Sequence, residues 1–441
     1  MPTPGPGDIR GWLDAHVNLE RGIGRPAHEQ RITAPTLKRI EAMLALLGSP
    51  QLEYPILHIT GTNGKTTTAR IATALLATMG LSVGCYTSPH LERVNERITY
   101  NGEPISDEDL DELLRIVALV EGELDEPPSY FDILTAAAYR WFADLAVHAA
   151  VIEVGVGGTW DATNAADGQV AVVTNVSVDH VDYLGPTRES IAAEKAGIVK
   201  PGSVLVLGET DPDLTGYFVE RGPDVIMRRE RDFGVRANTP ALRGRVVELY
   251  TPGGSYPELF LPLHGAHQAD NAAVALAAVE AFTNAPVPED VVSAAFAQVD
   301  SPGRLEVVAR NPLVLLDGAH NVAGAQALRS ALDEEFATDA PRTVVVGLLR
   351  EKDPHEMLAA LGVDDAALVV CCRPPSPRAL DPSLVAKAAE ELGVPAAQIE
   401  VAETVREGVA TALLATPQEG QVIVTGSLYT VGAARSVLVH K

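Results

Sequence analysis

Residues 58–70 read HITGTNGKTTTAR, and here a glycine-rich turn joins a short apolar run to a helical pattern. The run at 55–59 predicts a buried strand, and the segment 66–80 predicts a helix that ends at Gly80. Glycines in such a turn let backbone N–H groups point at phosphate oxygens, and the helix N-terminus adds its positive dipole end. The stretch therefore predicts a phosphate-binding loop, although Ile59 stands where the usual pattern has its first glycine. A plain Gly/Asn turn is the alternative.

Within this loop the residue types suit a nucleotide. Lys65 supplies a positive charge for the β- and γ-phosphates, and the hydroxyl of Thr66 or Thr67 can lie near a metal ion.

Strand-like and helix-like segments alternate on both sides of the loop, which indicates an α/β fold with a mainly parallel sheet. A second alternation begins beyond residues 298–308, so we place a domain boundary near residue 300, giving domains 1–299 and 300–441. The runs expected to be strands are 82–87, 149–154, 170–176, 312–317, 343–349, 367–372 and 421–426, and the further helices are 35–48, 106–120 and 321–336.

Composition narrows the class of protein. The chain has 441 residues, is 46% hydrophobic and carries a formal net charge of −25. Such a charge repels nucleic acid and anionic membrane, so we expect neither as a partner. We expect Cys85, Cys371 and Cys372 to be buried thiols, because an odd count gives no disulfide framework. The N-terminus lacks the pattern of a signal peptide and no apolar run is long enough to span a bilayer, so we expect a soluble cytoplasmic protein.

Several polar residues follow predicted strands, where parallel sheets present ligand sites. Glu153 lies inside an apolar strand, where a carboxylate is costly to bury unless it is paired or bound to a cation. Ser88 and His180 also follow strands, and oxygen ligands with an occasional imidazole suit Mg²⁺. A Ser-Pro turn and a core histidine are the ordinary alternatives. Asp161 follows the glycines at 155, 157 and 158, which leave space for a ligand.

Further candidates lie farther along the chain. Lys195 stands in a helical stretch made otherwise mainly of small, apolar residues. A buried lysine is unfavourable there as a cation, and its neutral amine can become a carbamate. A salt bridge with a neighbouring acid is the alternative. Asp317 and His320 lie between a strand and a helix, and Arg304 lies at the domain junction, where it could reach phosphates. Phe131 could stack on an aromatic ligand or belong to the core.

Taken together, the sequence motifs resemble those of the Mur ligase superfamily, and more closely those of its folylpolyglutamate synthase/dihydrofolate synthase branch. The motifs that carry the resemblance are collinear over residues 55–435: TGTNGKT, TSPHL, VNERI, EVGVGGTWDATN, DHVDYLG, EKAGI, HGAHQADN, SPGRLE, DGAHN, EKD and GSLYTVG. The resemblance implies a P-loop domain with a mainly parallel sheet, like the Mur ligase central domain, that binds ATP and the pterin. A smaller Rossmann-like α/β C-terminal domain would follow it.

The resemblance implies that ATP drives ligation of L-glutamate to dihydropteroate or a reduced folate through an acyl phosphate. ATP and two Mg²⁺ ions are the implied cofactors, K⁺ is a further candidate ion, and we expect a monomer. Catalytic roles fall to Lys65, Lys195 (as a carbamate), Asp161 and His320. ATP binding falls to Thr62, Asn63, Gly64, Lys65, Thr66, Thr67, Asn271, Arg304 and Asp317, metal binding to Ser88, Glu153 and His180, and substrate binding to Ser129 and Phe131. The segment 16–24 is a candidate for a pterin-binding loop.

Three motifs depart from the folate pattern, at four positions. Thr66 replaces a glycine and gives the loop of peptidoglycan-type Mur ligases, Thr159 and Trp160 replace Arg-Leu, and Glu351 replaces an aspartate. A Mur-type ligase acting on a UDP-muramyl substrate therefore remains an alternative, although SPHL and the short segment before the P-loop favour the folate branch. A non-catalytic nucleotide-binding protein is a third reading, which the presence of Ser88, Glu153, His180 and Lys195 disfavours.

Overall fold

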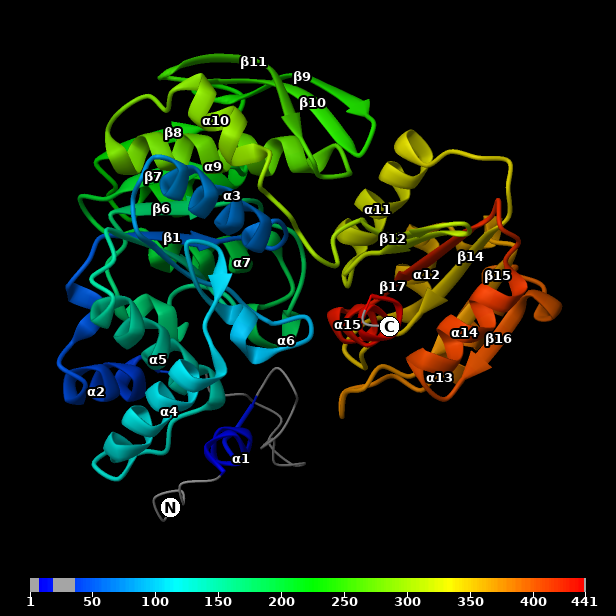
Figure 1. Cartoon of the computed structure of the whole chain (residues 1–441), viewed down its shortest axis with the longest axis horizontal. Helices are drawn as coiled ribbons and strands as arrows, with labels where there is room; N and C mark the ends of the chain where they lie inside the picture. Colours follow the sequence, from blue (N-terminus) through cyan, green and yellow to red (C-terminus); the bar gives the residue numbers. More distant parts are fainter. Residues whose placement is uncertain (1–7, 19–35, 440–441) are drawn as a thin grey trace. The chain divides into compact units, whose positions relative to one another are not determined.

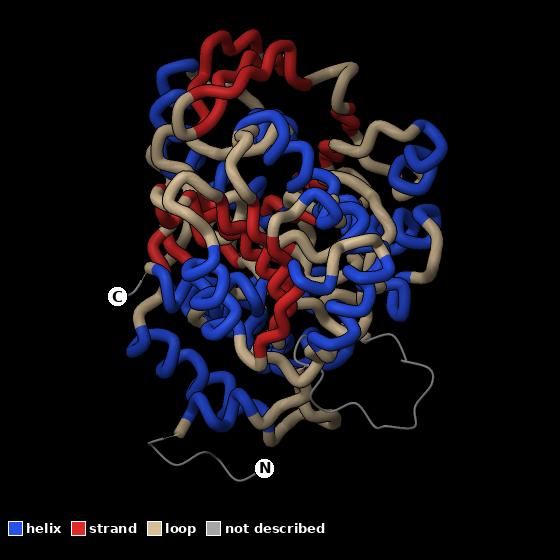
Figure 2. The backbone as a smooth tube through the Cα atoms, turned by 90° about the vertical axis from the view of Figure 1, so that its right-hand side faces the viewer, coloured by secondary structure: helices blue, strands red, loops and turns tan. Residues whose placement is uncertain are grey.

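The computed structural model describes residues 8–18 and 36–439, and these form two compact units. The larger unit runs up to Thr239 and includes Val246–Pro262 and Gln268–Val299. The smaller unit comprises Pro240–Arg245, Leu263–His267 and the chain from Asp300 onward. In both units helices pack around strands (Figures 1 and 2).

An eight-stranded sheet forms the centre of the larger unit. Its order is β4-β3-β2-β5-β1-β6-β7-β8, and only β3 and β4, at one edge, pair antiparallel. The strands are β1 (Ile56–Thr60), β2 (Val83–Tyr86), β3 (Ile98–Tyr100), β4 (Glu103–Pro104), β5 (Ala149–Glu153), β6 (Val170–Val173), β7 (Val204–Leu207) and β8 (Val225–Arg228).

Helices α2 and α4 of the larger unit each bury an apolar face, whereas α9 is buried almost all round. In α2, Ile40 and Leu44 are fully buried, and Gly48 follows the helix with φ +89°. Ser106 caps α4 by accepting a hydrogen bond from the backbone N–H of Asp109. The helices are α1 (Ile9–Asp14), α2 (Lys38–Leu46), α3 (Lys65–Thr78), α4 (Asp107–Glu121), α5 (Tyr130–Asp144), α6 (Val181–Leu184), α7 (Arg188–Lys195), α8 (Pro212–Val219), α9 (His267–Thr283) and α10 (Glu289–Phe296).

A separate three-stranded sheet, of order β11-β10-β9, follows in the chain. It comprises β9 (Gly234–Ala241), β10 (Gly244–Thr251) and β11 (Gly254–Leu261), and the sequence analysis missed it. Its strands mix exposed and buried residues, so they lack the continuous apolar runs of the central parallel strands.

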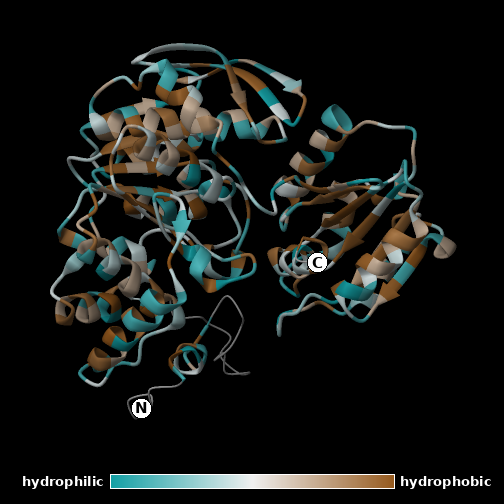
Figure 3. Cartoon of the chain, in the orientation of Figure 1, coloured by the Kyte–Doolittle hydropathy of each residue, from teal (hydrophilic) through white to brown (hydrophobic). Residues whose placement is uncertain are grey.

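The smaller unit has a six-stranded sheet of order β12-β13-β17-β14-β15-β16, in which only the β12–β13 pair is antiparallel. Its central strands are strongly apolar (Figure 3), and Cys371 and Cys372 are buried free thiols there. The elements are β12 (Glu306–Arg310), β13 (Leu313–Leu316), β14 (Arg342–Val346), β15 (Leu368–Cys372), β16 (Ile399–Ala402), β17 (Gln421–Thr425), α11 (Val322–Glu335), α12 (Pro354–Leu361), α13 (Pro382–Glu391), α14 (Val405–Ala415) and α15 (Leu428–Leu438).

Candidate active site

The predicted phosphate-binding loop joins the central strand β1 to helix α3. Gly64 ends it with φ +83°, and a Cβ there would lie 2.2 Å from the side-chain oxygen of Asn271. Only glycine therefore fits both the backbone angle and the close approach of Asn271. The loop also rests on the segment after β6, because the backbone N–H of Asn63 donates to Oδ1 of Asn175 at 3.0 Å. Asn271, predicted from a distant motif, thus lies against the loop.

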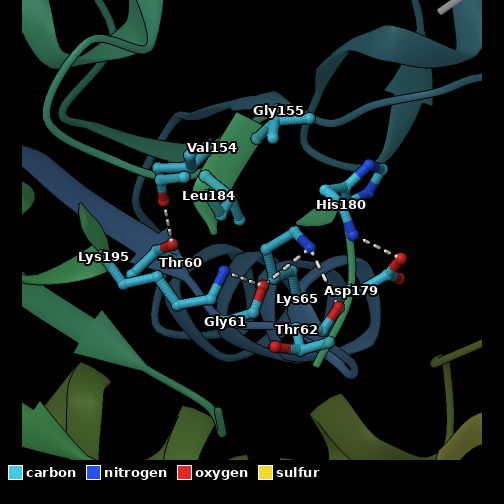
Figure 4. A pocket seen from close by; sticks show the side chains of 12 residues that line it. Thr60, Gly61, Thr62, Lys65, Val154, Gly155, Asp179, His180, Leu184 and Lys195 are labelled. Atoms are coloured by element: carbon cyan, nitrogen blue, oxygen red, sulfur yellow. Dashed lines mark hydrogen bonds between the residues drawn. The ribbon is translucent and has the colours of Figure 1, made fainter. Parts of the chain in front are cut away.

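Two lysines meet at the carbonyl of Gly61 (Figure 4). Lys65 Nζ and Lys195 Nζ each donate to this oxygen at 2.9 Å. Lys195 is buried, and burial, reinforced by the charge of Lys65, lowers the pKa of its amine to about 7. The structure therefore holds a partly neutral amine beside a phosphate-binding loop.

Glu153 and Thr66 contact each other at the start of α3. The Thr66 hydroxyl lies 2.9 Å and 3.0 Å from the two carboxylate oxygens, and the backbone N–H of Ser88 donates to Oε2 at 3.2 Å. Glu153 is 1% exposed. A buried carboxylate beside two hydroxyl-bearing residues offers the hard oxygen donors that Mg²⁺ or Mn²⁺ prefers.

This donor set fits a metal that also binds phosphate and water. Among the described residues, no three His, Cys, Asp or Glu side chains gather closely enough to hold an ion by themselves. Mg²⁺ commonly takes one or two protein carboxylates and completes its shell with waters and substrate phosphates. Glu153, Ser88 and Thr66 would hold such an ion at the edge of the loop.

His180 lines the same pocket from the segment after β6. It adopts φ +51° at the N-terminus of α6, and its backbone N–H donates to Oδ1 of Asp179 at 2.7 Å. Figure 4 shows that pocket, whose lining residues are Thr60, Gly61, Thr62, Lys65, Val154, Gly155, Val156, Gly157, Asp179, His180, Leu184 and Lys195. The segments after β1, β5 and β6 and the end of α7 thus meet in one place, as expected for the carboxyl edge of a parallel sheet.

Asp161 organises the glycine-rich wall of this pocket. Its Oδ2 accepts from the backbone N–H of Val156 at 3.0 Å, and its Oδ1 accepts from the N–H of Thr163 at 3.0 Å. Burial raises its pKa to about 6, although these hydrogen bonds favour the ionised form. Phe131 packs on the same wall, because a Cβ on Gly155 would come within 2.7 Å of its ring.

Several predicted residues have clear structural roles. Ser129 is the N-cap of α5, where its hydroxyl accepts from the N–H of Asp132 at 3.1 Å. Thr62 donates to the carbonyl of Ser177 at 3.0 Å, and Thr67 is buried in the first turn of α3. Thr159 donates to the carbonyl of Glu194 at 3.1 Å, next to Lys195, so this departure from the folate pattern braces α7.

The remaining predicted residues belong to the smaller unit. Asp317 accepts from the N–H groups of Leu305 and Ala319, both at 2.9 Å, and burial raises its pKa while Arg304 opposes the shift. Arg304 donates to the carbonyl of Gly318 at 3.3 Å, and His320 Nδ1 lies 2.8 Å from the same oxygen. These three side chains form one cluster, and their part in ATP binding stays a prediction.

Sequence reasoning missed some of the site and could not place all of it. Asn175 contacts the predicted loop, but an Asn after a strand is too common to be singled out. The candidate pterin loop at 16–24 lies outside the described residues from position 19 onward. Among the described residues, no helix is long and apolar enough to cross a membrane.

Comparisons with known proteins identify the family. The Mur ligase middle domain model matches residues 131–279, and the Mur ligase glutamate ligase domain model matches residues 303–428. A Mycobacterium tuberculosis relative, dihydrofolate synthase/folylpolyglutamate synthase, is 42% identical over 99% of this chain and 95% of its own length. The chain belongs to the Mur ligase family. Within that family it belongs to the folylpolyglutamate synthase/dihydrofolate synthase branch, so the resemblance inferred from its motifs is confirmed.

Solved structures of this branch superpose closely on the chain. Mycobacterium tuberculosis folylpolyglutamate synthase complexed with ADP gives a TM-score of 0.89 at 39% identity and covers 98% of both chains. An Escherichia coli enzyme in complex with DHPP and ADP gives 0.84 at 29% identity, over 97% of both. A bifunctional folylpolyglutamate synthase/dihydrofolate synthase with Mn, AMPPNP and L-glutamate bound gives 0.84 at 28% identity, over 99% of both. The α/β fold with Mur ligase domains is thereby confirmed.

Proposed function

We propose that this chain ligates L-glutamate to the carboxyl group of dihydropteroate or a reduced folate, with cleavage of ATP to ADP and phosphate. The observation that carries the proposal is the meeting of Lys65 and Lys195 at one pocket, next to the contact between Thr66 and the buried Glu153, in a chain 42% identical to a dihydrofolate synthase/folylpolyglutamate synthase over nearly its whole length. Relatives with nucleotides, Mn, L-glutamate and DHPP bound support the same substrates here.

The reaction needs two transfers. A carboxylate oxygen of the acceptor attacks the γ-phosphorus of ATP, ADP leaves, and an acyl phosphate forms. The amine of L-glutamate then attacks the acyl carbon, phosphate leaves, and the nitrogen loses a proton as the amide forms. Because the transferred phosphoryl group carries most of the charge, positioning and neutralisation supply most of the rate enhancement.

The residues of the larger unit suit these tasks. The loop 61–64 and the N-terminus of α3 would bind the phosphates, and Lys65 would offset their charge. Glu153, Ser88 and Thr66, with His180 as a further ligand, would hold divalent metal, two Mg²⁺ ions in our proposal, and the bound metal would supply charge to polarise the γ-phosphate. K⁺ remains a candidate further ion.

Lys195 is proposed to act as a carbamate. Its neutral amine can attack CO₂ and release a proton to solvent, and the carbamate formed would be an anion beside the cationic Lys65, replacing a repulsive pair with an attractive one. Asp161 holds the glycine wall where Phe131 and Ser129 would meet the pterin side of the acceptor. Arg304, Asp317, Asn271 and His320 would complete the nucleotide and glutamate sites, and the chain would act as a cytoplasmic monomer.

Phosphate release tests the function. The purified protein receives ATP, Mg²⁺ and L-glutamate with one acceptor at a time: dihydropteroate, tetrahydrofolate monoglutamate or a UDP-muramyl peptide. Turnover with dihydropteroate establishes the synthase step, and turnover with both pterins establishes a bifunctional enzyme. Turnover with tetrahydrofolate alone leaves only chain extension. Turnover with the UDP-muramyl peptide alone would overturn the proposal in favour of the Mur-type alternative.

A further inference from the structure

His58 is a buried histidine in the centre of the larger sheet. It lies on β1, between β5 and β6, and is 0% exposed. Its strand neighbours Leu57 and Ile59 are apolar and equally buried. Among the described residues its Nδ1 has no hydrogen-bond partner. A buried acceptor without a partner costs free energy that an aliphatic side chain would avoid, so packing alone does not explain a histidine here.

The other ring nitrogen begins a chain of hydrogen bonds. His58 Nε2 lies 2.9 Å from Oγ1 of Thr163, and this hydroxyl lies 2.5 Å from Oδ1 of Asp161. An ionised carboxylate can only accept, so Thr163 donates to Asp161 and accepts from His58. His58 must therefore carry its proton on Nε2. Burial, reinforced by Lys200, lowers the pKa of His58 to about 3, which keeps the ring neutral.

The chain of hydrogen bonds ends on the pocket wall. The second oxygen of Asp161 accepts from the backbone N–H of Val156, and Gly155, Val156 and Gly157 all line the pocket. Gly155 has no room for a side chain, because an added Cβ would lie 2.7 Å from Phe131 and 3.1 Å from Asp161 Oδ2. A small rotation of Asp161 would therefore move the wall against which the acceptor is proposed to bind.

We propose that His58 is a positioning residue, which orients the Thr163 hydroxyl and through it Asp161, and so sets the acceptor-facing wall at residues 155–157. The inference rests on the proposed function for the identity of the acceptor. His58 itself touches neither substrate nor nucleotide. The hydrogen bond from Lys65 to the carbonyl of Gly61 and the one from Asn63 to Asn175 are not part of this chain of hydrogen bonds, so binding of MgATP should be insensitive to it.

Steady-state kinetics of matched variants test the proposal. His58→Phe keeps a ring and removes the donor, whereas His58→Gln keeps an N–H near the position of Nε2. We expect His58→Phe to raise the KM of the pterin acceptor about tenfold, the equivalent of one lost hydrogen bond, with the KM of MgATP within about twofold of wild type. His58→Gln should restore most of the acceptor affinity. Thr73→Val, which removes a buried hydroxyl within α3, is the control for a general loss of packing.

Variants of Thr163 provide an independent test, which remains valid if His58→Phe fails to fold. Thr163→Val should raise the acceptor KM like His58→Phe, Thr163→Ser should not, and the double variant should be no worse than either single one. If the effects of the two substitutions on the acceptor KM multiply in the double variant, the two residues act separately, and the proposal is overturned. An equal rise in both KM values, or a loss of thermal stability with an unchanged acceptor KM, would also overturn it.

A spectroscopic measurement tests the same chain of hydrogen bonds without depending on enzyme activity. With ¹⁵N-labelled histidine and His58→Gln for assignment, NMR of the wild-type protein should show His58 as a neutral Nε2–H ring between pH 7 and pH 8, where Asp161 is ionised, shifted in Thr163→Val. An Nδ1–H ring or an imidazolium would overturn the inference. If the wild-type protein shows no turnover, by contrast, that result counts against the proposed function. The NMR measurement would still decide whether His58 takes part in this chain of hydrogen bonds.

Discussion

At the scale of single residues, Lys195 shows how burial changes the pKa of an amine. Its amine donates to the carbonyl of Gly61 beside Lys65, and its pKa falls to about 7. In the unfolded chain the pKa returns to about 10.4. The unfolded state therefore binds more protons between pH 7 and pH 10, and folding stability rises with pH across that window. Below pH 7 the full cost of the buried cation is present.

Replacing Lys195 with methionine should remove this cost. In CO₂-free buffer at pH 6 we expect Lys195→Met to unfold with a free energy a few kcal/mol above that of wild type, since each pKa unit corresponds to about 1.4 kcal/mol. The advantage should vanish near pH 10. Denaturant titrations from pH 6 to pH 10 measure it, with the exposed Lys387→Met as control. A difference that stays constant with pH would contradict the assignment of a lowered pKa.

The carbamate makes a separate prediction. Lys195→Ala should lose glutamate-dependent phosphate release, because neither amine nor carbamate remains at the P-loop. Short carboxylates such as acetate should restore part of the activity by entering the vacated space beside Lys65. The assay is phosphate release with and without acetate, with chloride at equal ionic strength as control. Full activity in the variant without any carboxylate would rule out a role for the modified lysine.

At the scale of elements, α5 positions Phe131 through its N-terminal cap. Ser129 and Asp132 each bond the other's backbone N–H, so the helix starts at a fixed residue. The assignment of Ser129 to substrate binding and its observed role as a cap make different predictions. A cap contributes to stability, whereas a substrate contact contributes to KM.

We expect Ser129→Ala to lower the free energy of unfolding by about 1 kcal/mol, the usual cost of a lost N-cap. Ser129→Thr should keep most of that stability, because its hydroxyl can still accept from Asp132. Chemical denaturation and the acceptor KM are measured for both variants. A raised KM for Ser129→Thr at unchanged stability would show that the side chain also contacts the substrate.

At the scale of the whole molecule, the smaller unit is assembled from three separate stretches of chain. Arg245, which is 1% exposed, pairs with Glu335 and, at 3.0 Å, with Glu334. His264 Nδ1 lies 2.7 Å from Glu335 as well. The two short stretches Pro240–Arg245 and Leu263–His267 therefore supply the partners of the buried carboxylate at the end of α11.

Breaking this buried pair should be costly. We expect Arg245→Met to destabilise the protein by about 3 kcal/mol, because it leaves the Glu335 carboxylate buried with fewer partners. The exposed pair of Arg373 and Asp381 gives the control, and Arg373→Met should cost less than about 1 kcal/mol. Denaturant unfolding compares the two variants. Equal losses of unfolding free energy in the two variants would show that burial of Arg245 does not increase its contribution to stability.

The sequence predicted those parallel strands that are buried on both faces and read as long continuous apolar runs. It missed the parallel strands β7, β8 and β16, the strands β3 and β4 at one edge of the larger sheet, and β9, β10 and β11, which mix exposed and buried residues. It also missed β12, which is only partly buried and pairs antiparallel with β13 at the edge of its sheet. An edge strand lacks the burial that makes a central strand recognisable.

The sequence by itself determined the α/β class, the P-loop and the family, because local patterns and collinear motifs are properties of the chain. Only the tertiary structure decided that Lys195 reaches the carbonyl of Gly61, that Thr66 meets Glu153, and that His58 connects through Thr163 to Asp161. These pairs are separated by 87 to 134 residues, except for Thr163 and Asp161, which are two residues apart. Such contacts depend on which strands lie side by side in the sheet, and no local pattern carries that information.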